Sequence, residues 1–216
     1  MILPILERGK IDYSIPGFTL DVNQIPLNDP SNWTPPMNNL INLEWNYFKV
    51  NSIELCVTPE TPEEIMRGAP TADHGHIAYT RFQKSQLFKS RPAGTTLTLS
   101  QQDSNTLWLG IRGILFPTVD DFHLTFNHRS DVSQVFFHTV ASGSLSSSVF
   151  VTMDNDILRH EHELKRELGI TVLTPNHTWE EFQPKYDLYS PSNSEITSLY
   201  TEQRELFDRL NTESSK

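Results

Sequence analysis

The amino-acid sequence predicts a mainly β protein, an antiparallel β-sandwich of about eight strands with an extended N-terminal arm and C-terminal helices. Three observations predict it. Prolines and asparagines crowd the N-terminus, apolar and polar residues alternate through the middle of the chain, and the apolar spacing becomes helical after Met153. The expected organisation is therefore an arm over residues 1–40, a sandwich domain over 41–153 and a helical extension over 154–216.

The arm is expected to be extended. Prolines at positions 4, 16, 26, 30, 35 and 36 prevent a long helix and favour turns. Its apolar side chains are too numerous for a disordered tail: Ile15, Phe18, Leu20, Ile25, Leu27 and Trp33. We expect the arm to lie against its own domain or against a neighbouring subunit.

The sandwich is predicted from a period of two, which is typical of half-buried strands. The alternating groups are Leu43, Trp45 and Tyr47; Ile53, Leu55 and Val57; Ile77 and Tyr79; Leu97 and Leu99; Leu107, Leu109 and Ile111; Phe122, Leu124 and Phe126; residues 135–140; and residues 145–153. Turn-forming residues separate several of them. One short helix is expected inside this region, because Thr61 can cap it, Pro62 suits its first position and Gly68 can end it.

Two helices are predicted after the sandwich. Asp154 or Asn155 can cap the first, which ends at Gly169, and Ser192 or Ser194 starts the second. Between them we expect at most one helical turn, near residues 178–182. The second helix carries a single apolar stripe, expected to dock on the sandwich or on a partner protein: Ile196, Leu199, Tyr200, Leu206, Phe207 and Leu210.

Composition excludes several functions. The chain has 17 Lys and Arg against 27 Asp and Glu, a net charge of -10, so no overall positive field attracts nucleic acid or an anionic membrane. The single cysteine, Cys56, permits no intrachain disulfide, and the apolar N-terminal residues are too few for a signal peptide. No apolar run reaches the ~20 residues of a membrane span. We expect an intracellular protein with no integral membrane insertion.

No catalytic constellation, metal site or cofactor site is predicted. His74 and His76 lack a following glutamate ligand, and the spacing of His160 and His162 does not match a zinc-protease helix. Cys56 lies in a predicted strand, and Asp120 with Asp121 is interpreted as a turn rather than an acid pair. The sequence supports no enzyme class, and the prediction is a nonenzymatic protein without cofactors.

One local segment departs from the acidic average. Residues 81–91 contain four basic groups, two aromatic rings and no acid. Basic groups neutralise phosphates and aromatic rings stack on bases, so this segment is the candidate for single-stranded nucleic-acid contact. Its candidate contact residues are Arg81, Phe82, Lys84, Phe88, Lys89 and Arg91. The alternative is that the rings are core residues and the charges protect a solvated strand edge.

Two stretches resemble a known family. Trp45–Pro59, followed by Gly75–Tyr79, resembles a segment of viral coat proteins. In that segment a strand runs into an Ile-Glu pair, a proline follows, and a strand that begins with glycine comes after a loop. Ser142–Val151 resembles the final strand of such viral jelly-roll domains. The same sheet followed by helices is similar to the thirty-kilodalton superfamily of plant-virus movement proteins. Their arginine position is matched by Arg81, while their preceding aspartate is absent here.

The resemblance implies a jelly-roll fold and a viral function. The arm carries few basic residues, which does not favour genome packaging, and the C-terminal helices fit a movement protein better than a shell subunit. The expected function is therefore nonenzymatic, movement-type binding of single-stranded RNA in the host cytoplasm, for transport between cells at their junctions. The alternatives are a self-associating capsid subunit found in the virion and a matrix-like or host-adaptor protein that binds a host protein.

Overall fold

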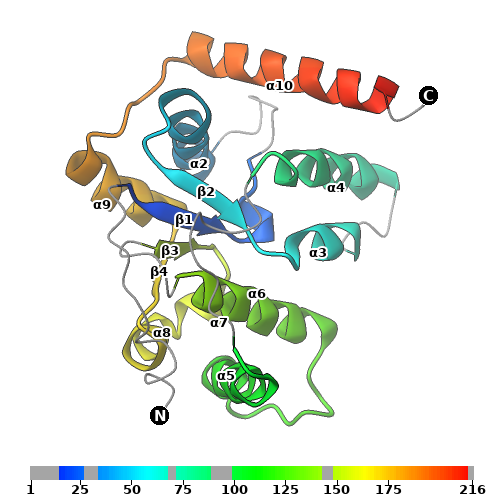
Figure 1. Ribbon diagram of the computed structural model, residues 1–216, viewed down its shortest axis with the longest axis vertical. Helices are drawn as coiled ribbons and strands as arrows, with labels where there is room; N and C mark the ends of the chain where they lie inside the picture. The colour runs from blue at the N-terminus through cyan, green and yellow to red at the C-terminus, as the bar shows by residue number, and fades with distance from the viewer. Residues whose placement is uncertain (1–14, 27–33, 68–71, 89–98, 143–147, 214–216) are drawn as a thin grey trace.

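The protein is an α/β structure in which helices cover both faces of a small parallel sheet (Figure 1). The computed structural model describes residues 15–26, 34–67, 72–88, 99–142 and 148–213. The strands are β1 (Gly17–Leu20), β2 (Glu54–Val57), β3 (Ser148–Val151) and β4 (Thr171–Leu173), and they pair in the order β2-β1-β3-β4. The predicted antiparallel jelly-roll sandwich is therefore wrong, because every one of these pairings is parallel.

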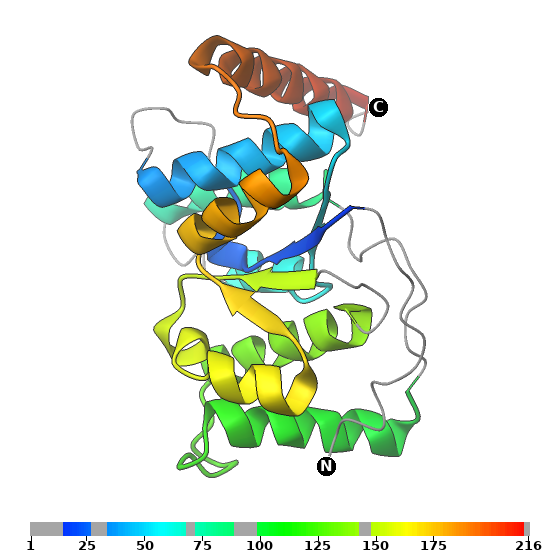
Figure 2. The same cartoon turned by 90° about the vertical axis from the view of Figure 1, so that its left-hand side faces the viewer.

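Helices account for most of the described chain. They are a 3-10 turn η1 (Val22–Gln24), α2 (Pro35–Trp45), a π-helical turn η3 (Asn46–Val50), α3 (Thr61–Arg67), α4 (Ala72–Ser85), α5 (Gln101–Leu115), α6 (Phe126–Ser142), α7 (Asn155–Leu158), α8 (Glu161–Leu168), α9 (Pro175–Tyr186) and α10 (Asn193–Glu213). Figure 2 shows α2 and α9 on one side of the sheet, with α5, α6 and α8 on the other.

Successive side chains of a strand point to opposite faces of the sheet, so β1 and β3 contribute to a separate hydrophobic core on each face. In β1, Phe18 and Leu20 point to the α2–α9 side, whereas Thr19 points to the opposite side and its Oγ1 lies 2.8 Å from the Nδ1 of His138 on α6. In β3, Phe150 packs with α5, α6 and α8, while Val149 and Val151 pack on the α2–α9 side. Both faces of the sheet are therefore buried, as parallel sheets require.

Several groups predicted as strands form helices. In α5, Leu107, Ile111 and Leu115 are buried at intervals of four residues, while Leu109 is 55% exposed. A strand would have put Leu107, Leu109 and Ile111 on one face. Three apolar residues at every second position are thus also compatible with a helix that buries the first and the last of them and exposes the middle one. The groups at 43–47, 77–79 and 135–140 likewise lie in α2 with η3, in α4 and in α6.

The remaining strand predictions had different outcomes. The group at 53–57 contains β2, and the group at 145–153 contains β3. Residues 122–124 lie in a connection, and Phe126 is the first residue of α6. Leu97 lies outside the described residues. The sheet takes strands from all three expected segments, and β1, one of its two interior strands, comes from the arm.

Local capping signals placed several helix ends closely. Helix α3 includes Thr61 as its first residue, where the sequence expected Thr61 to precede the helix as its cap, and the expected end at Gly68 lies outside the described residues. Asp154 caps α7 by accepting bonds from the backbone N–H groups of Asp156 and Ile157. Gly169 ends α8 with a φ of 73°, a left-handed conformation that glycine adopts without strain. The sequence did not predict the interruption between α7 and α8, the strand β4 or the full length of α9, where only one turn was expected.

The apolar stripe of α10 docks within the chain. Ile196, Leu199 and Tyr200 pack with Ile41 of α2, and Phe207 is also buried. Leu206 is half-buried, and the side chain of Leu210 lies outside the described part. Docking on the protein's own fold is one of the two arrangements expected for this stripe; its use by a partner protein stays a prediction. Of the helices that the structure describes, none combines the length and apolar character needed to cross a membrane.

Candidate functional site

Four carboxylates from distant parts of the chain meet at the carboxyl edge of the sheet. Asp21 directly follows β1, Glu64 lies on α3 after β2, Asp131 lies on α6, and Asp154 follows β3. The neighbours of β1 are β2 on one side and β3 on the other, so the chain changes direction across the sheet between β1 and β3. In open parallel α/β sheets, ligands bind at this edge, where the strand order reverses.

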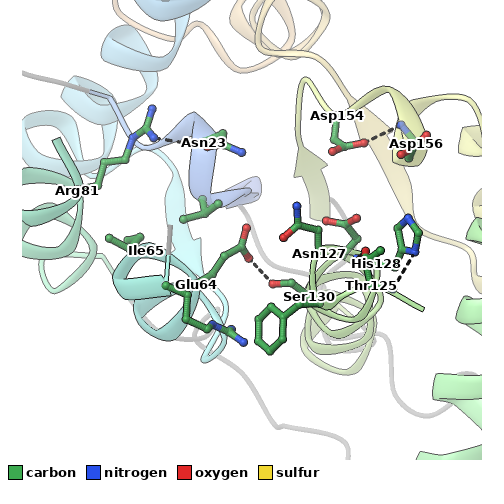
Figure 3. Close-up of a pocket in the computed structure, with 14 residues that line it drawn as sticks. Asn23, Glu64, Ile65, Arg81, Thr125, Asn127, His128, Ser130, Asp154 and Asp156 are labelled. Atoms are coloured by element: carbon green, nitrogen blue, oxygen red, sulfur yellow. Dashed lines mark hydrogen bonds between the residues drawn. The ribbon is translucent and has the colours of Figure 1, made fainter. Parts of the chain in front are cut away.

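A pocket of about 540 Å³ opens at this place. Glu64 and Arg81 approach it from one side, and Asp154 and Asp156 approach from the other (Figure 3). Asp131 also lines it. The lining is therefore mainly polar and charged, and its carboxylates come from helices on both sides of the sheet.

Asp21 is the most enclosed of the four carboxylates. Its side chain accepts a hydrogen bond of 2.7 Å from Thr152 Oγ1 and a longer one of 3.3 Å from Gln134 Nε2. Burial raises the pKa of Asp21 to about 6, the bond from Thr152 opposes that rise, and the charge of Glu64 adds to it. A carboxyl group with this pKa can exchange its proton near neutral pH.

Glu64 is held from α6. Its Oε2 accepts hydrogen bonds of 2.5 Å from Ser130 Oγ and 2.6 Å from Gln134 Nε2. Burial raises the pKa of Glu64, and these two bonds counteract the rise. Gln134, only 1% exposed, thus bridges Glu64 and Asp21, and its Oε1 has no hydrogen-bond partner among the described residues. A buried oxygen without a donor, beside two carboxylates, is a further electron-rich ligand for a cation or water.

Asp131 has the most strongly altered protonation of the group. Burial raises its pKa to about 8, and the charges of Asp154, Asp21 and Glu64 raise it further. No hydrogen bond to its carboxyl group is found in the described part of the chain. Burial and the repulsion among these like charges therefore favour the protonated form of Asp131.

The pocket presents carboxylate and amide oxygens. Carboxylate and amide oxygens are the ligands that Mg²⁺ and Mn²⁺ take in proteins. Within the described ranges, no three histidine, cysteine or carboxylate side chains already stand in positions that could hold a metal ion. Like-charged carboxylates repel one another, and a cation placed between them would let side-chain rotation bring them together.

Two arginines supply positive charge at the same pocket. Arg81 donates from Nη1 to Asn23 Oδ1 over 3.4 Å, and its buried Nε has no partner in the described structure. Burial lowers the pKa of Arg81, while Asp21 raises it. Arg67 stacks its guanidinium on the ring of Phe126, with 3.9 Å from Cζ to the ring centroid. Both guanidinium groups line the pocket, so they can approach an anionic substrate bound there.

The predicted nucleic-acid segment is divided by the fold. Arg81 lines the pocket, whereas Phe82 and Phe88 pack in the α2–α9 core. Lys84 is fully buried and pairs with Glu44 at 2.9 Å. Lys89 and Arg91 lie outside the described residues. In this structure Lys84 and Phe88 offer a ligand almost no surface, and nucleic-acid contact by the segment stays a prediction.

The other sequence candidates lie away from this pocket. Cys56 is buried in β2, and the side chains of His74 and His76 fall outside the described part. His162 is exposed on α8. Asp120 Oδ1 accepts bonds of 3.1 Å from the backbone N–H groups of Phe122 and His123, which is the turn that the sequence indicated.

The sequence analysis missed the carboxylate site. A usable signal was present at two positions, because Gly17–Leu20 is a short apolar run followed directly by Asp21, and Val149–Val151 is followed closely by Asp154. Acidic residues after short buried strands are candidates for a site at the carboxyl edge of a parallel sheet. The contributions of Glu64 and Asp131 depend on how α3 and α6 pack.

Fold and site together define an α/β protein with an acidic pocket at the reversal point of a parallel sheet. No protein-family model matches the chain, and no curated protein matches it significantly. A functional assignment therefore depends on the geometry and electrostatics of this pocket.

Proposed function

We propose that the protein is a divalent-cation-dependent hydrolase of phosphodiester bonds. The observation that supports this most strongly is the convergence of Asp21, Glu64, Asp131 and Asp154, whose charges act on one another beside a pocket at the reversal point of the sheet. Such a concentration of negative charge is costly without a cation, and it is the arrangement that metal-assisted phosphoryl chemistry uses.

Asp21 and Asp154 are the residues that would hold the cation. They follow β1 and β3, which pair directly in the sheet, so the sheet fixes the position of both. When bound, the cation would supply Lewis-acid stabilisation of the charge on the phosphoryl oxygens. Mg²⁺ commonly takes one or two protein carboxylates together with substrate phosphates, which fits a pocket open to an incoming ligand.

The arginines explain how an acidic chain can accept a phosphodiester. With a net charge of -10, the protein repels polyanions overall, so attraction must be local. Arg81 has guanidinium N–H groups to donate to a non-bridging phosphate oxygen, and planar guanidinium groups suit phosphate. Substrate orientation by Arg81 would then bring the phosphorus to the carboxylates.

Asp131 is the residue suited to move a proton. Burial, and then the charges of the neighbouring carboxylates, raise the pKa of its carboxyl group to about 8. A group that exchanges its proton near neutral pH can accept one from an attacking water and return it to the leaving oxygen. Glu64, held by Ser130 and Gln134, would help to fix the position of the neighbouring carboxylates.

The test is hydrolysis of a labelled oligonucleotide with Mg²⁺ or Mn²⁺, compared with excess chelator. We expect cleavage only with the cation, and a loss of at least about 100-fold for Asp154→Asn, because one ligand of the cation is weakened. Asp208→Asn is the matched control, since Asp208 is exposed on α10. Circular dichroism would confirm that both variants fold.

A binding measurement makes the outcome decisive. Bound Mn²⁺ should raise the unfolding temperature of the wild-type protein more than that of Asp154→Asn, because a ligand that binds only the folded state stabilises it. If Mn²⁺ shifts neither protein and no phosphodiester is cleaved, the proposed function is wrong. Equal cleavage by the wild type and Asp154→Asn would contradict the assigned site.

Nonenzymatic binding of single-stranded nucleic acid is the second candidate, favoured by the presence of Arg81 at a pocket. Salt-sensitive binding without cation-dependent cleavage would support it over hydrolysis. The movement-type, capsid and host-adaptor functions stay predictions, and the jelly-roll fold that suggested the first two is not the fold of this chain.

A further inference from the structure

An exposed aromatic ring stands at the rim of the acidic pocket. Phe126 is the first residue of α6, lines the pocket and remains 54% exposed. Exposing so large an apolar side chain in a concave polar site forgoes burial that would otherwise stabilise the fold. The ring is held in place by Arg67, whose guanidinium carbon lies 3.9 Å from the ring centroid.

The Arg67–Phe126 stack lies one helical turn from the carboxylate contact. On α3, Arg67 follows Glu64 by three residues, and on α6, Phe126 precedes Ser130 by four. Such pairs lie on one face of a helix, with about 5–6 Å between their Cβ atoms. Because Glu64 bonds Ser130 across the pocket at 2.5 Å, the stack bridges the same two helices beside it.

We infer that Phe126, backed by Arg67, forms a stacking subsite for an unpaired nucleobase of the polynucleotide whose phosphodiester lies at the carboxylates. This inference rests on the proposed function and specifies its substrate. An aromatic face binds any base by stacking, and an adjacent arginine adds positive charge for the backbone phosphate. A base inside a duplex already has both faces covered, so the subsite selects unpaired nucleotides.

The guanidinium of Arg67 is fixed in place against the ring of Phe126. Arg67 is anchored by its Nε, which donates to the backbone oxygen of Glu63 at 3.0 Å, and by an ion pair with Glu60. The anchored guanidinium lies against the ring, while the residue Phe126 stays 54% exposed. A preorganised platform of this kind binds a base with little further ordering of its own side chains.

The test compares Phe126→Ala with Phe122→Ala on two kinds of oligonucleotide. Phe122 is the matched control, because it is 97% exposed and does not line the pocket. One oligonucleotide carries all its bases, and the other has the same backbone with stable abasic sites; RNA and DNA versions of each distinguish the two sugars. Affinity is measured with Ca²⁺ by fluorescence anisotropy, and cleavage with Mn²⁺ under single-turnover conditions.

We expect Phe126→Ala to lose about 10- to 100-fold in affinity and cleavage efficiency on the base-containing strand, the range for one lost base stack. On the abasic strand it should equal the wild type, Phe126→Trp should retain base-dependent binding, and Phe122→Ala should leave both strands unaffected. An equal loss on both strands, or no loss on either, would overturn the stacking subsite. So would the absence of oligonucleotide binding by the wild-type protein.

The same measurements separate this inference from the proposed hydrolysis. If binding depends on Phe126 and on the bases but no strand is cleaved with any divalent cation, the subsite holds and the hydrolase assignment fails. If all strands are cleaved equally well by wild type and Phe126→Ala, hydrolysis holds and the subsite fails.

Discussion

Replacing Asp131 by asparagine should stabilise the protein at neutral pH. The substitution keeps the shape of the side chain and removes an ionisable group whose pKa is raised to about 8 by burial and by the charges of Asp154, Asp21 and Glu64. A raised carboxyl pKa means that the folded state binds the proton more tightly than the unfolded state does. The stability that this proton adds to the folded state is complete below pH 3.8 and is lost as the pH rises to about 8.

The magnitude follows from proton linkage. A carboxyl group that titrates at 3.8 in the unfolded chain and near 8 in the fold would cost up to about 4 kcal/mol at pH 7 relative to a neutral group. The cluster opens onto a pocket and its four carboxylates share the repulsion, so one substitution relieves only part of this cost. We expect Asp131→Asn to raise the free energy of unfolding by about 1–3 kcal/mol at pH 7.

The assay is urea unfolding of wild type, Asp131→Asn and the exposed control Asp208→Asn at pH 5, 7 and 9, in chelator. The wild type should lose stability between pH 5 and 8, Asp131→Asn should lose clearly less, and Asp208→Asn should follow the wild type. The reasoning is refuted if Asp131→Asn is less stable than wild type at pH 7, or if its stability falls with pH as steeply. Such a result would mean that Asp131 is not repelled by its neighbours.

Three further predictions concern the fold. Lys84→Met should cost about 3–5 kcal/mol in urea unfolding, because the buried charge of Glu44 loses its counter-ion and keeps only hydrogen bonds such as the one from Gln203. Adding Glu44→Leu should recover most of the loss, and a loss below about 1 kcal/mol for Lys84→Met would show that the pair is absent. Ile111→Ala should cost about 2–5 kcal/mol and Leu109→Ala less than about 0.5, whereas equal costs would contradict the helical face of α5. Gly169→Ala should lower stability by about 1 kcal/mol, because its φ of 73° strains an L-residue, and an unchanged unfolding midpoint would argue against that conformation.

Much of the local structure could be predicted from short-range chemistry. Thr61 and Asp154 mark helix starts, Gly169 marks a helix end, and the spacing from Ile196 to Phe207 predicts α10. These signals work because a capping hydrogen bond or a left-handed turn involves only neighbouring residues.

The strand predictions failed where a short pattern has two solutions. Leu107, Leu109 and Ile111 satisfy a strand with all three on one face, and equally a helix that buries two of them and exposes Leu109. Only packing against α6 and α8 decides between them. For the site, Arg81 was named for its charge, while Asp131 and Glu64 gave no signal, since helical carboxylates are ordinarily solvated surface.

The sequence by itself determined the acidic charge, the helix caps at Asp154 and Gly169, the C-terminal amphipathic helix and two of the short apolar strands. Tertiary structure alone decided that strands from residues 17–20, 54–57, 148–151 and 171–173 pair in parallel, which brings Asp21 beside Asp154. The physical reason is that parallel pairing joins segments separated by long crossovers, and strands of three or four residues carry too little pattern to specify their neighbours. The pocket exists only once those pairings have formed.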